Sequence, residues 1–149
     1  MNEPLFILAS ASPRRQELLH KAGYRFTVIP SGVDEEAFGT EGIDAVSLCK
    51  QLALAKAKDV AARFADRFVL GADTVVDTDG HIIGKPANAA DAERITRKLF
   101  SRPHKVITGI ALVCLAQNIE IVEADITTVY PRPLTDAQIA AHIAGGSWQ

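Results

Sequence analysis

Residues 8–19 read Leu8-Ala9-Ser10-Ala11-Ser12-Pro13-Arg14-Arg15-Gln16-Glu17-Leu18-Leu19 and predict a strand, a tight turn and a helix start. An apolar run that begins at Leu5 ends at small hydroxyl residues, after which Ser12 suits an N-cap and Pro13 the first helical position. Two arginines in a first helical turn oppose the helix dipole. A polyanion such as a nucleoside triphosphate would offset that effect, because guanidinium binds phosphate bidentately. A capped surface helix with two solvated arginines fits the local spacing equally well.

The composition predicts one globular domain. The chain has 149 residues, 48% of them hydrophobic and 23% charged, and its net charge is −2. That balance argues against bulk binding of nucleic acid or an anionic membrane. No apolar stretch is long enough to span a bilayer and the N-terminus has no signal-peptide pattern, so we expect a cytoplasmic protein. Cys49 and Cys114 lack paired spacing and are expected to be buried free thiols.

Alternating apolar patterns predict an α/β (α+β mixed) fold with a twisted mixed sheet flanked by helices. Two long strands follow one another late in the chain and are expected to pair in an antiparallel manner. A hairpin is expected at Asp79-Gly80 and a capping box at Thr135 with Gln138. The expected strands are Leu5–Ala9, Phe26–Ile29, Phe68–Ala72, 75–76, 82–83, 106–115 and 119–129, and the expected helices are 13–22, 43–65, 89–100 and 136–144, with an acidic loop over 33–42.

Two acidic positions are candidates for chemistry. Asp73 ends the apolar run of residues 68–72, which predicts a carboxylate at the C-terminal edge of a strand, where open α/β sheets bind ligands. It could hold a metal or accept a proton from water, or it could be a turn aspartate bonded to its own backbone. Glu35 lies among three consecutive acids, which favour either a hard divalent cation or a solvated loop.

Two lysines could reach phosphate oxygens, although either could also be an ordinary surface lysine. Lys56 lies within the long alanine-rich helix, and Lys85 follows the hairpin between Gly84 and Pro86. His104 and Thr108 lie on a predicted strand, where a lone histidine is more often structural than catalytic. The chain has no Walker A loop and no GxGxxG motif, which argues against a P-loop or a dinucleotide site.

Taken together, these segments resemble the Maf family of nucleoside triphosphate pyrophosphatases, which is related in fold to the Ham1/ITPase group. Six motifs carry the resemblance in the family's order and over most of the chain. They are residues 8–15, the acids at 33–36, Leu52-Ala53 with Lys56-Ala57, Gly71-Ala72-Asp73-Thr74, Gly84-Lys85-Pro86 and His104-Lys105-Val106-Ile107-Thr108. The resemblance implies a single Maf-like domain over residues 1–149, with a central cleft.

The resemblance implies hydrolysis of a triphosphate between its α- and β-phosphates, with a divalent cation (Mg²⁺, Mn²⁺ or Co²⁺) as cofactor. By carry-over, Asp73 is the proton acceptor, and Glu35 and Asp73 hold the metal. Glu35, Lys56 and Lys85 complete the expected catalytic set. The expected substrate-binding residues are Ser10, Arg14, Arg15 and Thr74.

Two positions imply the substrate. The branch of the family that acts on dTTP and UTP has arginine and threonine where this chain has Arg14 and Thr74, whereas the 7-methyl-GTP branch has an aromatic residue and glutamine. We therefore expect a dTTP/UTP pyrophosphatase that also accepts modified pyrimidine triphosphates. The alternatives are an enzyme for 7-methyl-GTP or non-canonical purine triphosphates, and a non-catalytic nucleotide-binding regulator of cell division.

The family's sequence pattern continues beyond Gln149 through a glycine-rich motif that contains a third specificity position. We therefore expect the chain to lack the family's C-terminal segment and, as 149 residues alone, to show weak or no activity. The family also implies a possible homodimer.

Overall fold

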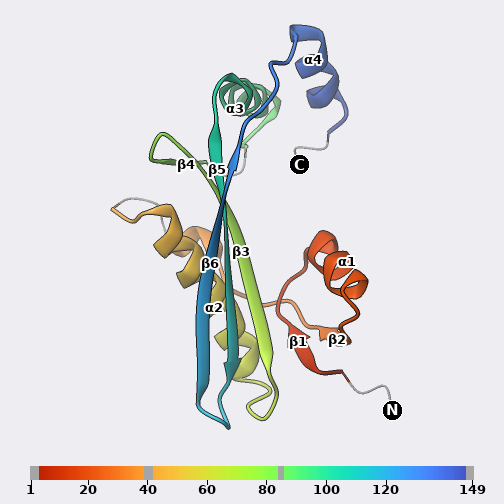
Figure 1. Ribbon diagram of the computed structural model, residues 1–149, viewed down its shortest axis with the longest axis vertical. Helices are drawn as coiled ribbons and strands as arrows, with labels where there is room; N and C mark the ends of the chain where they lie inside the picture. The colour runs from red at the N-terminus through yellow and green to blue at the C-terminus, as the bar shows by residue number, and fades with distance from the viewer. Residues whose placement is uncertain (1–3, 39–41, 84–85, 147–149) are drawn as a thin grey trace. The chain divides into compact units, whose positions relative to one another are not determined.

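The computed structural model describes residues 4–38, 42–83 and 86–146. Within these ranges the chain forms a mixed α/β structure, as predicted (Figure 1). The strands are β1 (Phe6–Leu8), β2 (Phe26–Val28), β3 (Val69–Thr78), β4 (His81–Ile83), β5 (His104–Cys114) and β6 (Ile119–Val129). The helices are α1 (Pro13–Lys21), the short 3-10 helix η1 (Glu35–Phe38), α2 (Ala45–Ala61), α3 (Ala89–Ser101) and α4 (Asp136–Ala144). Within the described residues, no helix is both long enough and apolar enough to cross a membrane.

The strands form one mixed sheet in the order β2-β1-β3-β5-β6, and β4 pairs with β3 outside this path. β1 is parallel to both β2 and β3, with Ile7 opposite Val69 and Leu8 opposite Leu70. β4 is antiparallel to β3 around the predicted turn, where Asp79 and Gly80 both have positive φ. The predicted mixed sheet and hairpin are therefore confirmed.

The chain divides into two compact units, which are described separately. The first, called the N-terminal unit here, contains residues 1–74 and 108–125, and the second contains residues 75–107 and 126–149. The prediction of a single domain over the whole chain stays a prediction.

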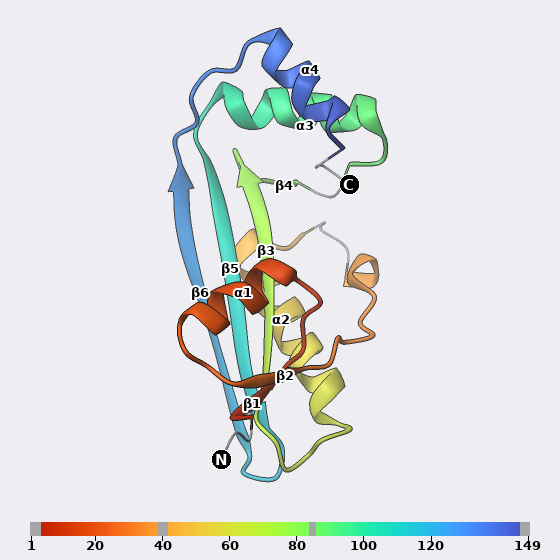
Figure 2. The same ribbon diagram turned by 90° about the vertical axis from the view of Figure 1, so that its right-hand side faces the viewer.

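The core of the N-terminal unit lies between the sheet and α2. Small residues dominate it, so helix and strands approach closely; its members are Ile7, Ala9, Ala53, Ala57, Val60, Ala61, Val69, Ala111 and Val113. Two glycines set this distance, because a Cβ on Gly71 would lie 2.2 Å from the carbonyl oxygen of Ala53 and one on Gly109 would lie 2.7 Å from that of Cys49. Figures 1 and 2 show α2 on one side of the strands and α1 on the other.

α1 begins as the sequence predicts. Ser12 caps it by accepting a hydrogen bond from the backbone N–H of Arg15, and Pro13 is the first helical residue. α2 is shorter than predicted and begins after Asp44, whose side chain accepts from the N–H of Ser47. Residues 35–38 form η1, so the expected acidic loop contains a helical turn.

In the second unit, α3 packs against α4. α4 carries the predicted capping box: the Thr135 hydroxyl accepts from the N–H of Gln138 at 3.1 Å, and the Gln138 side chain accepts from the N–H of Thr135 at 2.9 Å.

One prediction about β3 is wrong. Asp73 does not end a strand, because β3 continues from Val69 to Thr78. The residues that follow Asp73 are β-branched, which favours a strand, and β5 pairs beside them. β1, however, ends opposite Leu70, so Asp73 lies just beyond the parallel part of the sheet.

Candidate active site

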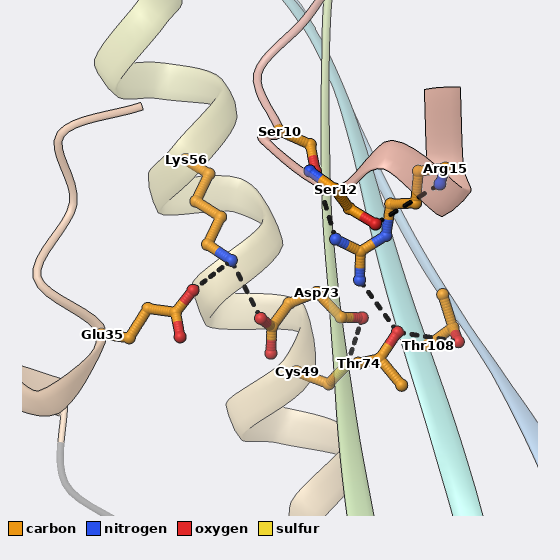
Figure 3. A network of polar contacts seen from close by, with 9 residues as sticks. All are labelled: Ser10, Ser12, Arg15, Glu35, Cys49, Lys56, Asp73, Thr74 and Thr108. Atoms are coloured by element: carbon orange, nitrogen blue, oxygen red, sulfur yellow. Dashed lines mark hydrogen bonds and ion pairs between the residues drawn. The ribbon is translucent and has the colours of Figure 1, made fainter. Parts of the chain in front are cut away.

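Three charged side chains of the N-terminal unit meet beside β3. Lys56 Nζ lies 2.9 Å from Asp73 Oδ1 and 2.5 Å from Glu35 Oε1 (Figure 3). Asp73 is 6% exposed and Lys56 is 9% exposed, whereas the side chain of Glu35 is 43% exposed. One buried ammonium group therefore lies between a buried carboxylate and a more exposed one.

The helix α2 brings this cluster together. Its buried residues include Cys49, Ala53, Lys56 and Val60, which recur at helical spacing on the face that packs against the sheet. Lys56 is thus a lysine inside an apolar stripe, and it reaches two carboxylates. α2 also holds the segment before η1, because Asp59 Oδ2 accepts a hydrogen bond from the N–H of Gly32 at 2.8 Å.

The environment of Asp73 favours its neutral form. Burial raises the pKa of the Asp73 carboxyl above its usual value, and the hydrogen bond and charge of Lys56 oppose that effect without overcoming it. The charge of Glu35 raises the same pKa further, and the charge of Arg15 lowers it. A carboxylate with a raised pKa is a better proton acceptor than an ordinary one.

Cys49 is a neighbour of Asp73 that the sequence interpretation missed. Its thiol donates a hydrogen bond to the backbone oxygen of Asp73 at 3.0 Å. Cys49 lies seven residues, or about two helical turns, before Lys56 on the same face of α2. Cys49 therefore holds the backbone of Asp73 while Lys56 holds its side chain. Cys49 and Cys114 are both buried free thiols, as predicted.

A second cluster surrounds Arg15. Its Nη1 donates to Ser10 Oγ at 3.2 Å and its Nη2 donates to Thr74 Oγ1 at 2.9 Å (Figure 3). Ser10 is 6% exposed and also accepts from the N–H of Ser12 at 3.3 Å. Thr74 Oγ1 lies 3.3 Å from Thr108 Oγ1, a contact that the sequence interpretation missed.

The two clusters lie on opposite faces of the sheet. Consecutive strand residues point to opposite faces, so Asp73 points toward α2 and Thr74 toward α1 (Figure 3). Of the predicted site residues, Glu35, Lys56 and Asp73 meet on the first face, and Ser10, Arg15 and Thr74 meet on the second.

The remaining two predicted residues are Arg14 and Lys85. Arg14 is exposed on α1. Lys85 lies outside the described residues.

The carboxylate pair fits a divalent cation. Glu35 and Asp73 each place one oxygen against Lys56 Nζ, so the two carboxylates lie together around one positive charge. Mg²⁺ is usually held by one or two carboxylates together with substrate phosphates, so two carboxylates are as many ligands as the protein needs to supply. Within the described ranges, no group of three or more His, Cys, Asp or Glu residues could hold an ion alone.

The second unit contains a hollow of about 250 Å³ that holds none of the predicted site residues. Its lining consists of Asp77, Asp79, Gly80, Pro103, His104, Lys105 and Thr128. His104 Nδ1 lies 3.0 Å from the backbone oxygen of Leu99, which agrees with the structural role expected for this histidine.

The fold and the chain both have known relatives. The structure is similar to that of the Staphylococcus aureus Ham1 protein, with a TM-score of 0.50 and 13% sequence identity over 84% of this chain and 70% of that one. This likeness defines the class of fold, a mixed α/β structure of the Ham1 type.

A family model described as Maf-like protein matches residues 5–149, so the chain belongs to the Maf family. The dTTP/UTP pyrophosphatase of Citrifermentans bemidjiense is 46% identical over 147 residues, which cover 98% of this chain and 75% of that protein. The dTTP/UTP pyrophosphatase of Moorella thermoacetica is 44% identical over 94% of this chain and 70% of its own length. The family resemblance found from the motifs is confirmed.

Proposed function

We propose that this chain is a nucleoside triphosphate pyrophosphatase that hydrolyses dTTP and UTP to the monophosphate and pyrophosphate. The observation that carries the proposal is the buried Asp73 carboxylate, which contacts Lys56 and has a raised pKa. The names of the Maf relatives, dTTP/UTP pyrophosphatase at 44–46% identity, support the same reaction.

In the proposed reaction, Asp73 accepts a proton from the water molecule that attacks phosphorus. The new phosphorus–oxygen bond forms as the bridging bond between the α- and β-phosphates breaks, and pyrophosphate leaves. Phosphoryl transfer depends mainly on positioning and on stabilisation of negative charge. Its contact with Lys56 supports Asp73 as the positioned base.

Positive side chains supply the charge stabilisation in this proposal. Lys56 is already directed toward the carboxylates and is 9% exposed, so its charge acts in a poorly solvated place. Arg15 is held by Ser10 and Thr74 and keeps further N–H donors for phosphate oxygens. Lys85 is proposed as a phosphate contact on the motif alone.

Glu35 and Asp73 would hold the divalent cation, Mg²⁺, Mn²⁺ or Co²⁺. When bound, such an ion neutralises phosphate charge and lowers the pKa of water. A cytoplasmic location, a single domain and a homodimer remain proposals that rest on the sequence.

Arg14 and Thr74 are proposed to read the base. The arginine offers several donors to the carbonyl oxygens of a pyrimidine, and Thr74 offers a hydroxyl whose position is fixed by Arg15. A panel of dTTP, UTP, CTP, GTP, ITP and 7-methyl-GTP with each metal separates this specificity from the purine alternatives. Binding of a triphosphate without release of pyrophosphate would support the alternative of a non-catalytic nucleotide-binding regulator.

Replacing Asp73 with asparagine tests the mechanism. Pyrophosphate release from UTP should fall by about 10²–10⁴-fold, because general base catalysis contributes that much. The matched control is Asp66→Asn, which makes the same change at an exposed position of the N-terminal unit and should leave the rate unchanged. Equal turnover in Asp73→Asn and the wild type would exclude Asp73 as the base.

A further inference from the structure

Thr74 has two hydrogen-bonding neighbours in the N-terminal unit. Arg15 Nη2 donates to its hydroxyl oxygen at 2.9 Å, and the hydroxyl oxygen of Thr108 lies 3.3 Å from the same atom (Figure 3). Thr74 is exposed on β3, and Thr108 is half-buried on the neighbouring strand β5. The more sheltered hydroxyl therefore lies behind the one that solvent or a ligand can reach.

The number of bonds that a hydroxyl can make limits what Thr74 presents. A threonine hydroxyl has one hydrogen to donate and two lone pairs that accept. Arg15 only donates, so it occupies one lone pair of Thr74. Thr108 then takes either the hydrogen or the second lone pair. In the first case Thr74 can only accept from a ligand, and in the second it can only donate.

We propose that Thr108 is a positioning residue that donates its hydroxyl hydrogen to Thr74, so that Thr74 meets the base of the nucleotide as a donor only. This inference rests on the proposed function, in which Thr74 reads the base. Uracil and thymine carry an acceptor oxygen at position 4, whereas cytosine carries a donor amino group there. A hydroxyl of fixed polarity distinguishes these bases, while a hydroxyl free to turn accommodates both.

The experiment compares variants of the full chain with the wild type. Thr108→Val removes the hydroxyl and keeps the branched shape, and Thr108→Ser keeps the hydroxyl. The matched control is Thr27→Val, the same change at an exposed strand threonine of the same unit. kcat and KM are measured for UTP and CTP, and the Kd values of their non-hydrolysable α,β-methylene analogues are measured by calorimetry.

The preference for UTP over CTP should fall by about threefold to tenfold in Thr108→Val, which is the value of one neutral hydrogen bond. The change should appear in KM and Kd, and kcat for UTP should stay within about twofold, because Thr108 is not placed against the reacting atoms. Thr108→Ser should restore the preference. In a Thr74→Val background, Thr108→Val should add no further change.

The outcomes separate this inference from the proposed function. An unchanged preference in Thr108→Val, with an active wild type, overturns the inference alone. A wild type that releases no pyrophosphate but whose analogue preference shifts in Thr108→Val refutes the pyrophosphatase and supports the inference. Failure to bind either analogue overturns both. If Thr108→Val does not fold, Thr108→Ala is measured in its place and an unchanged preference there is equally decisive.

Discussion

Replacing Gly71 with alanine should force α2 away from β3 and damage both stability and activity. A Cβ at this position would lie 2.2 Å from the backbone oxygen of Ala53, 2.8 Å from the backbone nitrogen of Ala57 and 3.0 Å from its Cβ. Two of the three obstacles are backbone atoms of a helix, so no side chain can rotate away. The helix and the strand must separate instead.

The geometry gives the size of the effect. An ordinary contact begins at 3.4 Å, so the helix must move by about 1 Å at Ala53. Overpacking of this kind destabilises by about 1–3 kcal/mol, and a rigid backbone obstacle places Gly71→Ala near about 3 kcal/mol. A misplacement of about 1 Å at a reacting group lowers a rate by about 10²-fold, and the contact at risk is the 2.9 Å pair of Lys56 and Asp73.

Urea unfolding followed by circular dichroism measures the first effect. With a slope of about 2 kcal/mol per molar urea, the midpoint should fall by about 1.5 M. Pyrophosphate release from UTP in the absence of urea measures the second. Gly32→Ala is the matched control, because its Cβ would have only Asp59 Oδ2 nearby, at 3.8 Å, and its stability should change by less than about 0.5 kcal/mol.

A second substitution identifies the obstacle. Ala57→Gly removes the side-chain contact at 3.0 Å but leaves the oxygen of Ala53 in place, so it should not rescue Gly71→Ala. Full rescue would show that the backbone contact does not set the distance between α2 and β3. Wild-type stability of Gly71→Ala would refute the packing argument altogether.

Two further predictions concern pH and capping. Because burial raises the pKa of Asp73 in the folded state, its stabilising contribution is fully present below the usual value of 3.8 and is lost as pH rises through the raised pKa. The unfolding free energy of the wild type relative to Asp73→Asn should therefore decrease from pH 3.8 toward neutrality, and a difference that does not vary with pH would contradict this. In the second unit, Thr135→Ala should lower the free energy of unfolding by about 1 kcal/mol, because it removes the cap of α4. The control Thr127→Ala, at an exposed position of β6, removes no cap and should lower it by less, as urea unfolding would measure.

Local chemistry explains which parts of the fold could be predicted. The Ser12-Pro13 helix start, the Asp79-Gly80 turn and the Thr135 capping box each involve residues close in sequence, and all three are present. The extent of β3 could not be predicted in the same way. An apolar run that stops at Asp73 looks like a strand end, whereas pairing with β5 carries the strand on to Thr78.

Part of the candidate site could also be predicted from the sequence. Lys56 stands in the apolar stripe of α2, and a lysine at such a position needs carboxylate partners, which was a usable signal for its contacts with Glu35 and Asp73. The contact of Cys49 with Asp73 and that of Thr108 with Thr74 were missed, because a thiol hydrogen-bonded to a carbonyl and a hydroxyl hydrogen-bonded to a hydroxyl leave no pattern in sequence. Gly109, the residue after Thr108 on β5, was a usable signal of a different kind, because a glycine inside a strand often indicates the close approach of another backbone, here that of α2 at Cys49.

The cluster around Lys56 and the cluster around Arg15 both depend on which residues of β3 face α2. Side chains alternate along a strand, so Gly71 and Asp73 face the helix while Thr74 faces Arg15. A slip of one residue would turn Asp73 toward α1 and place Ala72 against Ala53, where a Cβ does not fit. The glycine that permits close packing therefore also decides which face receives the carboxylate and which receives the hydroxyl. The proton transfer proposed for Asp73 and the base recognition proposed for Thr74 therefore belong to opposite faces of the sheet.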